Sequence, residues 1–269
     1  SNNGNNQKWY ISNSGNNYVS GVTGSIGIRP SINLKSTIKV VDGDGTESNP
    51  YRLEGDNDSN LLGTMLNTRY SGEYIRFGNS ENNLYRIVSH ENRGLTKITS
   101  SEPLKNSGTF VSSVFGSSSI FSSTNTIGTF LNGEYLNNYI DSSYSDMIED
   151  STTWYLGTVE SETSYKLSKY TDINMSSTAS NTTTAKVGLL RYGELMSGQF
   201  DISTNNNIYW LLTPYNESHV WYLYNNSMIT NGYNTMNNYG IRPSLNLKSN
   251  VIITGGDGTK NNPFQIKLS

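Results

Sequence analysis

One segment occurs twice in this chain, and the repeat constrains the fold more than any other sequence feature. The sequence GIRPSINLKS at residues 27–36 returns as GIRPSLNLKS at residues 240–249. A Gly-Asp-Gly-Thr sequence and then an Asn-Pro pair follow each copy at the same spacing. A repeat that keeps its internal gaps indicates one structural unit used twice. Alternating apolar and polar residues, a glycine-rich turn and a short final run predict β structure for both copies.

The repeated unit extends beyond this segment, because a Trp-Tyr pair precedes each copy at nearly the same distance. Trp9 corresponds to Trp221. More than a hundred residues of the second unit precede Trp221, whereas eight residues precede Trp9. We therefore expect residues 1–53 to be the C-terminal part of a preceding repeat module. A polar joint follows, and residues 54–269 are expected to form one complete module.

The composition indicates a folded, β-rich protein with long polar loops. Of the 269 residues, 33% are hydrophobic and 15% are charged, and Ser, Thr and Asn together exceed a third of the chain. Disorder usually requires low hydrophobicity together with a high net charge, and the net charge here is -3. Such a polar surface is typical of extracellular or cell-surface proteins. The chain has no basic stripe to displace phosphate counterions, which argues against nucleic acid as a partner.

The absence of cysteine rules out disulfides and thiolate metal sites in this sequence. No stretch has the pattern of a signal peptide or of a membrane-spanning helix, so we expect no membrane insertion in this chain. We also expect no cofactor.

Hydrophobic periodicity predicts an α+β fold: an irregular, loop-rich antiparallel sheet with a few short helices. The expected strands are residues 9–11, a hairpin of 73–78 and 84–88 with a third strand at 95–98, and 154–156, 187–191, 209–214 and 220–223. Short helices are expected at residues 60–70, at 130–140 continuing to 148, and as a turn at 192–196. Residues 101–129 are expected to be loop with strand fragments, and residues 176–184 a Ser/Thr-rich loop. The predicted core includes Trp210, Leu212, Trp221, Leu223, Ile241, Leu245 and Leu247.

Three segments near the C-terminus carry a family resemblance. They are YWLLTP at residues 209–214, VWY at 220–222 and GIRPSLNL at 240–247. Together they resemble the C-terminal pattern of the sulfatase-modifying-factor and C-type-lectin-like group of folds. More narrowly, the chain is similar to uncharacterised surface modules of Gram-positive gut bacteria that often follow prepilin-like N-termini. The resemblance implies a C-type-lectin-like, formylglycine-generating-enzyme-like fold and an extracellular or cell-surface location.

The chain departs from the catalytic members of that group. Those members generate formylglycine with a cysteine pair and copper, and this chain has no cysteine. Iron-dependent members use a histidine cluster, whereas only His90 and His219 occur here, far apart in the sequence. We therefore expect a protein that is not an enzyme. Glu149 and Asp150 are adjacent carboxylates, but no partner positions suggest acid–base work.

The loops of residues 213–239 contain the candidate ligand-binding residues. Aromatic side chains are dense there and could build a platform on which sugar rings stack, although strand alternation turns about half of them toward the core. His219 admits two interpretations, a ligand or general base beside Glu217 or an ordinary surface histidine, and the second is favoured. His90 beside Glu91 has the same two interpretations. The candidate ligand-binding residues are Tyr215, Glu217, His219 and Tyr233.

A second set of residues is expected to be structural. The arginines of the repeat could bind an anion or could tie their strands to loop carbonyls, and their presence in both copies favours the structural role. The prolines stand where a strand begins, so no ladder N–H is lost. Residues 42–45 resemble the start of a calcium loop, but the missing later ligands favour a turn. The structural set is Arg29, Pro30, Trp210, Trp221, Arg242 and Pro243.

These observations favour a non-enzymatic extracellular structural or adhesive module of a bacterial surface protein, such as a pilus or filament subunit. The alternative is a lectin-like domain that binds a glycan with the loops of residues 213–239. The expected partners are accordingly another copy, in head-to-tail self-association, or a host-surface glycan. Residues 1–53 could pack on their own chain or complete a neighbouring molecule. The second arrangement is favoured, because a small sheet with an open edge and an apolar face invites pairing.

Overall fold

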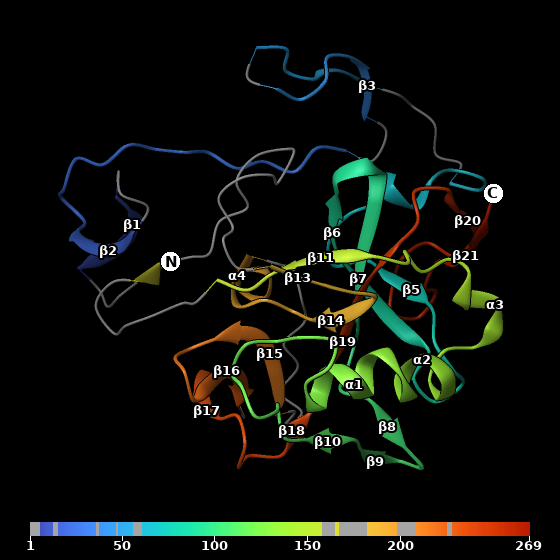
Figure 1. The fold of residues 1–269 in the computed structure, drawn as a ribbon. Coiled ribbons are helices and arrows are strands. Elements are labelled where there is room, and N and C mark those ends of the chain that lie inside the picture. Colours follow the sequence, from blue (N-terminus) through green and yellow to red (C-terminus); the bar gives the residue numbers. More distant parts are fainter. Residues whose placement is uncertain are drawn as a thin grey trace.

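Antiparallel strand pairs dominate the computed structural model of this chain, and its helices are short (Figure 1). The structure describes residues 6–12, 16–35, 38–46, 48–55, 61–157, 165–166, 182–197, 208–224 and 228–269. Within these ranges the fold is α+β and sheet-rich with a few short helices, which confirms the expected class at that level. No helix in the described ranges is long and apolar enough to cross a bilayer.

The central sheet has five antiparallel strands in the order β14–β19–β7–β6–β5. The second repeat copy contributes β19, in which Leu245 lies opposite Ile98 of one neighbour and Val187 of the other. All five residues of β19 are buried, so the repeat supplies an interior strand. The predicted hairpin and its third strand are confirmed as β5, β6 and β7. The strand bounds are β5 Tyr74–Arg76, β6 Leu84–Glu91, β7 Leu95–Ser100, β14 Val187–Leu189 and β19 Pro243–Leu247.

A second five-stranded sheet has the order β10–β18–β15–β16–β17, with one parallel pair between β15 and β18. Side chains alternate between its two faces. Trp210 and Tyr222 join the main core, whereas Tyr209 and Trp221 belong to a smaller cluster on the other face. The bounds are β10 Ser112–Ser113, β15 Tyr209–Pro214, β16 His219–Tyr224, β17 Met228–Tyr233 and β18 Tyr239–Gly240.

Short strand pairs and helices complete the described fold. The pairs are β1 Gln7–Ile11 with β2 Asn16–Gly21, β2 with β12 Tyr165–Lys166, β3 Ile38–Asp42 with β4 Arg52–Gly55, β8 Lys105–Asn106 with β9 Thr109–Phe110, β11 Thr152–Tyr155 with β13 Thr182–Ala185, and β20 Val251–Gly255 with β21 Gln265–Leu268. The helices are α1 Thr126–Asn132, α2 Glu134–Asn138, α3 Ser142–Ser145 and α4 Tyr192–Ser197, with 3-10 turns at Leu66–Thr68 and Asn92–Gly94.

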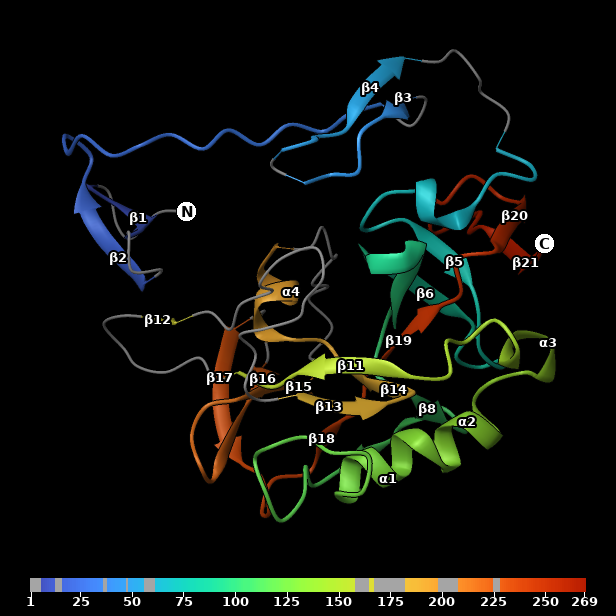
Figure 2. The ribbon, with the colours of Figure 1, turned by 45° about the horizontal axis from the view of Figure 1, so that its top comes forward.

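The main core lies between the two sheets and the helices α1 and α2 (Figure 2). At its centre the hydroxyl groups of Tyr85 and Tyr135 form a hydrogen bond of 2.8 Å. Burial raises the pKa of both phenols. All seven residues predicted for the core are buried, with Trp221 the most accessible at 7%, which confirms that prediction.

Residues 25–35, which include the first repeat copy, lie outside this core (Figures 1 and 2). They form no strand, and Ile28, Ile32 and Leu34 are exposed. The strand expected here is therefore wrong for the first copy. Extended backbone becomes a strand only when a neighbouring strand supplies ladder partners, and none of the described residues lies beside it in that way. A contact with the main body is the 2.8 Å hydrogen bond that the Tyr70 hydroxyl donates to the Leu34 carbonyl.

The hairpin that follows each copy nevertheless has the same structure. Strands β3 and β4 pair Val40 with Leu53 and then shift register, just as β20 and β21 do after pairing Ile253 with Ile266. In both turns glycine is required: φ is +88° at Gly43 in one and +81° at its counterpart in the other. A Cβ at either position would lie 2.2 Å from a proline carbonyl oxygen. Local sequence is therefore sufficient to set this hairpin.

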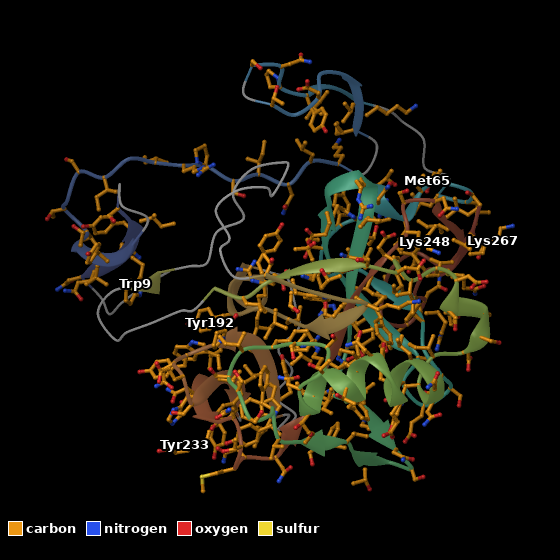
Figure 3. All side chains as sticks on the ribbon, viewed as in Figure 1. Trp9, Met65, Tyr192, Tyr233, Lys248 and Lys267 are labelled. Atoms are coloured by element: carbon orange, nitrogen blue, oxygen red, sulfur yellow. The ribbon has the colours of Figure 1, made fainter. Side chains whose placement is uncertain are left out.

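The two hairpins that carry the Trp-Tyr pairs, β1–β2 and β16–β17, also resemble each other. Trp9 pairs with Val19 across β1 and β2, and Trp221 pairs with Asn231 across β16 and β17. The strands of the two hairpins are similar in length: β1 and β2 have five and six residues, and β16 and β17 have six each. Trp9 lies on the hairpin away from the main body (Figure 3), where β2 pairs with β12. The repeat therefore covers a hairpin, the Gly-Ile-Arg-Pro segment and a second hairpin in each half, and the middle segment is a strand only in the second copy.

Several sequence predictions need correction. The helix expected at residues 60–70 is limited to a 3-10 turn at Leu66–Thr68; residue 60 lies outside the described residues. The helix expected at 130–148 begins earlier, at Thr126, because the Asn125 side chain caps it by accepting the Gly128 N–H at 2.9 Å. It is broken at Gly133, where α1 ends and α2 begins. Of the loop expected at 176–184, residues 182–184 belong to β13 and the rest lies outside the described residues.

Candidate functional site

The β15–β16 turn and the end of β17 bring together three of the four candidate ligand-binding residues. His219 begins β16 and pairs directly with Tyr233 at the end of β17. The centroids of their rings are 4.0 Å apart, and the Tyr215 ring lies 6.3 Å from the imidazole. We call Tyr215, His219 and Tyr233 the aromatic cluster. Glu217 is exposed in the same turn, but no ring contact places it in the cluster.

A buried tryptophan supports the cluster from below. The ring of Trp221 lies 5.1 Å from that of Tyr215 and 5.0 Å from that of Tyr192, edge to face in both cases. The rings therefore form a row that begins at buried Trp221 and ends at Tyr233, which is 49% exposed. Tyr192 and Tyr233 both lie on the side of the molecule built by β15, β16 and β17 (Figure 3). Such edge-to-face pairs fix ring orientation beyond simple burial.

The turn that presents the cluster is held by one asparagine. The side-chain oxygen of Asn216 accepts the backbone N–H of Ser218 at 3.0 Å and that of His219 at 2.9 Å. The His219 Nδ1 lies 3.1 Å from the same oxygen. The Ser218 hydroxyl lies 3.0 Å from the His219 Nδ1 as well. The imidazole therefore adds polar nitrogen atoms to the aromatic rings of the cluster.

The predicted structural residues occupy two different environments. Arg242 is buried; its Nε donates to the Ser100 carbonyl at 2.6 Å and its Nη1 to the Tyr209 hydroxyl at 2.8 Å. It therefore ties the start of β19 to the end of β7, and Pro243 begins β19. Arg29 and Pro30, the equivalent residues of the first copy, are exposed.

The two tryptophans of the structural set are also buried. Trp210 Nε1 donates to the Ser113 carbonyl at 2.9 Å, which satisfies the indole inside the core. Its ring lies 4.7 Å from that of Tyr239. Trp221 lies on the opposite face of the same sheet, beneath the aromatic cluster.

The glycine-rich turns use their aspartates for internal hydrogen bonds. Asp44 accepts the backbone N–H of Thr46 at 3.0 Å, and Asp257 accepts that of Thr259 at the same distance. Hydrogen bonds from the threonine side chain and backbone lower the pKa of each carboxyl. In the described part of the chain, no group of three or more His, Asp or Glu side chains is arranged to hold a metal ion. These turns thus have the geometry of Asx turns.

Sequence reasoning missed a buried ion pair. Lys97 of β7 donates from Nζ to Glu194 of α4 at 2.5 Å, and both side chains are almost fully buried. The Lys97 ammonium also lies 4.6 Å from the Trp154 ring. Burial by itself would raise the pKa of Glu194, but the charges of Lys97 and Arg191 lower it below its usual value. Lys97 and Glu194 are 97 residues apart, and each lies in a segment of both polar and apolar residues. No sequence pattern therefore predicts that they pair.

The cavities near charged residues are small or mixed in charge. The space beside Lys97 has a volume of about 10 Å³, which holds at most one water. A groove of about 200 Å³ is lined by Arg86, Lys105 and Lys260 together with Glu81 and Glu102. A wider groove of about 640 Å³ has Glu73, Arg86 and Lys260 in its lining, and its volume falls within the range of about 300–1,000 Å³ that drug-sized ligands usually occupy. No residue of the aromatic cluster lines any of these three cavities.

His90, the other histidine, lies in the central sheet far from the cluster in the fold. Its Nε2 contacts the Arg69 carbonyl and its Nδ1 lies 3.3 Å from the Thr96 hydroxyl. Arg69 in turn forms a bidentate pair with Glu73. The structure thus places His90 in a network of fold-stabilising hydrogen bonds.

Comparison with known proteins gives one family match. A domain of unknown function (DUF6273) is similar to residues 124–249, a stretch that extends from just before α1 to just after β19 and includes the aromatic cluster. Residues 27–55 lie outside the matched stretch. No curated protein and no solved structure matches the chain.

Proposed function

We propose that this chain is a non-enzymatic structural or adhesive module of an extracellular bacterial surface protein, linked in series to modules of its own kind. A pilus-like or filament-forming assembly is the specific form that we favour. The proposal includes the C-type-lectin-like fold implied by the resemblance of residues 209–247. It also includes the division of the chain into the part at residues 1–53 and the module at residues 54–269.

The observation that carries this proposal is the exposed first repeat copy. Ile28 is 92% exposed, and Ile32 and Leu34 beside it are exposed as well. An exposed apolar segment of this kind marks an interaction surface. When a repeated structural element links one module to the next, the contact is head-to-tail and does not close into a pair. Modules linked in this way form a row, as in a fibre.

The environments of the titratable groups support the non-enzymatic part of the proposal. Catalytic acids and bases usually lie in a cleft with room for substrate. Here Lys97 and Glu194 neutralise each other beside a cavity of about 10 Å³. Arg69 and Glu73 form a second pair beside the 3-10 turn at Leu66–Thr68. The first pair joins β7 to α4, and the second lies within the turn that leads into β5.

A surface location gives a direct test. Antibodies raised against the purified protein should label intact, unpermeabilised cells of the source organism, with immunogold particles on the outer surface or on appendages. Antibodies against a cytoplasmic protein of the same cells provide the control and should label only after permeabilisation. Labelling that appears only in permeabilised cells would contradict the proposal.

A lectin-like role is the alternative, and the aromatic cluster is the specific observation that favours it. Aromatic faces beside a polar ring suit a sugar ring, which presents C–H groups on its faces and hydroxyls at its edge. The Tyr233 ring is accessible, and the His219 imidazole lies 4.0 Å from it. Tyr233 ends the edge strand β17, where an extended glycan could reach it, and Tyr215 and His219 are half-buried beside it.

A glycan array with the full chain tests this alternative. If the cluster binds a sugar, saturable binding should fall at least tenfold in Tyr233→Ala, which corresponds to about 1.4 kcal/mol. Tyr224→Ala is the matched control, because Tyr224 is an exposed tyrosine of the same sheet that lies outside the cluster. Equal binding by the two variants, or no saturable binding by the parent chain, would rule out the lectin-like role for this cluster.

A further inference from the structure

The two repeat copies have closely similar sequences but opposite burial. Ile28 is 92% exposed, whereas its counterpart Ile241 is fully buried. Ile32 is 79% exposed, whereas its counterpart Leu245 is fully buried between Ile98 and Val187 of the neighbouring strands. Residues 27–55 are called the N-terminal copy below, and residues 240–268 the C-terminal copy.

Differences between the copies follow the burial pattern of the C-terminal copy. At Ile253, Phe264 and Ile266, three of the hairpin positions that are buried there, the N-terminal copy keeps large apolar residues. They are Val40, Tyr51 and Leu53, and all are exposed in the N-terminal copy. Charged replacements fall where the C-terminal copy is exposed or half-exposed: Lys39 replaces Ile252, Glu47 replaces Lys260 and Glu54 replaces Lys267. The N-terminal copy is therefore suited to the same buried environment.

The repeated arginine points to the same environment. In the C-terminal copy Arg242 donates to the Ser100 carbonyl and to the Tyr209 hydroxyl, both supplied by other strands of the module. Arg29 has the same neighbours in sequence but is exposed. Docked beside a counterpart of β7, it would meet the counterparts of the Ser100 carbonyl and of the Tyr209 hydroxyl of β15.

We propose that the N-terminal copy docks on a second module of this type that lacks its own β19, β20 and β21. The N-terminal copy then fills the positions of those three strands. The partner is a polypeptide that carries the counterpart of residues 61–239 without its own final strands. An intact copy of this chain does not offer the place, because its own β19 fills it between β14 and β7. The chain thus donates strands but does not accept them, so it stands at one end of a row of linked modules. This inference deepens the series linkage of the proposed function and rests on it for its biological setting.

The chain itself can be made into an acceptor. Residues 62–65 run beside β20: the Gly63 N–H donates to the Ile253 carbonyl at 2.8 Å, and the Ile253 N–H donates to the Thr64 carbonyl at 2.9 Å. Strand β21 lies on the other side of β20, so its end is about two strand spacings, ~10 Å, from this segment. The six-residue step from Gly55 to Leu61 spans up to about 20 Å. The N-terminal copy can therefore reach the empty place in its own chain or in a neighbour.

The test is a chain truncated after Tyr239, compared with the same truncation carrying Ile28→Asp and Ile32→Asp. We expect the first to unfold cooperatively and to retain the near-ultraviolet circular dichroism of its buried tryptophans, as a monomer or a strand-exchanged dimer. The second should lose both signals. The full chain with the two aspartates is the control and should keep its urea midpoint. Equal loss of structure in both truncated chains would overturn the proposal, as would unfolding of the control.

A cysteine pair tests the register independently, because the chain has no natural cysteine. Ser244 lies opposite Thr99 in β7, and Ser31 is the counterpart of Ser244. In the truncated chain, Ser31→Cys with Thr99→Cys should form a disulfide, whereas Ser31→Cys with Thr96→Cys should not. In the full chain the first pair should stay reduced, because Ser244 fills the place. A disulfide in the full chain, or none in the truncated chain, would contradict the proposed docking.

None of these measurements depends on cell-surface labelling, so this inference and the proposed function can fail separately.

Discussion

Replacing Lys97 by methionine is expected to lower the free energy of unfolding by roughly 3 kcal/mol. The substitution leaves the Glu194 carboxylate buried without the ammonium that lies 2.5 Å away. Loss of one partner from a buried ion pair usually costs about 3–5 kcal/mol, and Arg191, whose backbone N–H donates to the same carboxylate, keeps the cost at the lower end. Urea unfolding followed by tryptophan fluorescence measures the change. Lys105→Met is the matched control: Lys105 pairs with Glu102 in a partly exposed site, where loss should cost at most about 1 kcal/mol.

The pH dependence of this deficit distinguishes a lost charge from lost packing. In the parent chain the positive charges hold the pKa of Glu194 below its usual value, so its stabilising contribution is present above the unfolded-state pKa and is lost as the pH falls. Without Lys97 the pKa rises, and the carboxyl takes up a proton more readily. The deficit of Lys97→Met should therefore shrink between about pH 8 and about pH 5. A deficit that stays constant over this range would show that packing against Trp154, not charge, dominates.

Replacing Ile241 by alanine should destabilise the protein by about 2–5 kcal/mol, whereas the same change at Ile28 should alter stability by no more than about 0.5 kcal/mol. Both residues stand in the sequence Gly-Ile-Arg-Pro, so local propensity is the same. Ile241 is fully buried and its removal leaves a cavity in a packed core, whereas Ile28 is exposed.

Urea midpoints of the two alanine variants, measured under identical conditions with the parent chain, give the comparison. Equal destabilisation by both substitutions would mean that the N-terminal copy packs on its own module. A larger effect of Ile28→Ala than of Ile241→Ala would reverse the assignment of the interior copy.

Much of the local structure could be predicted from the sequence. The hairpin of β5 and β6, the strands β15 and β16 and the turn after each repeat copy follow from alternation and from glycines at fixed positions. These signals depend on residues close together in the chain. The helix expected at residues 60–70 failed because its apolar residues are drawn into separate contacts with the C-terminal hairpin, including the bridge between Met65 and Ile252.

The candidate site was predicted only in part. Aromatic density indicated the correct loops, and Tyr215, His219 and Tyr233 do come together. The register that places His219 opposite Tyr233 depends on the pairing of β16 with β17, and the row of rings continues to Tyr192, which precedes them by more than twenty residues. The ion pair of Lys97 and Glu194 had no sequence signal at all, since a strand residue and a helix residue meet only in the folded chain.

The two copies of one unit, with their similar final hairpins and the positive φ at Gly43 and Gly256, follow from local sequence. Which copy becomes the interior one depends on the tertiary structure. Hydrogen bonds within a hairpin join residues near in sequence, so each copy satisfies them alone. Burial of a strand requires neighbours on both sides, and β7 and β14 come from distant parts of the chain. Those two strands can hold one copy, which is why Leu245 is buried and Ile32 is exposed.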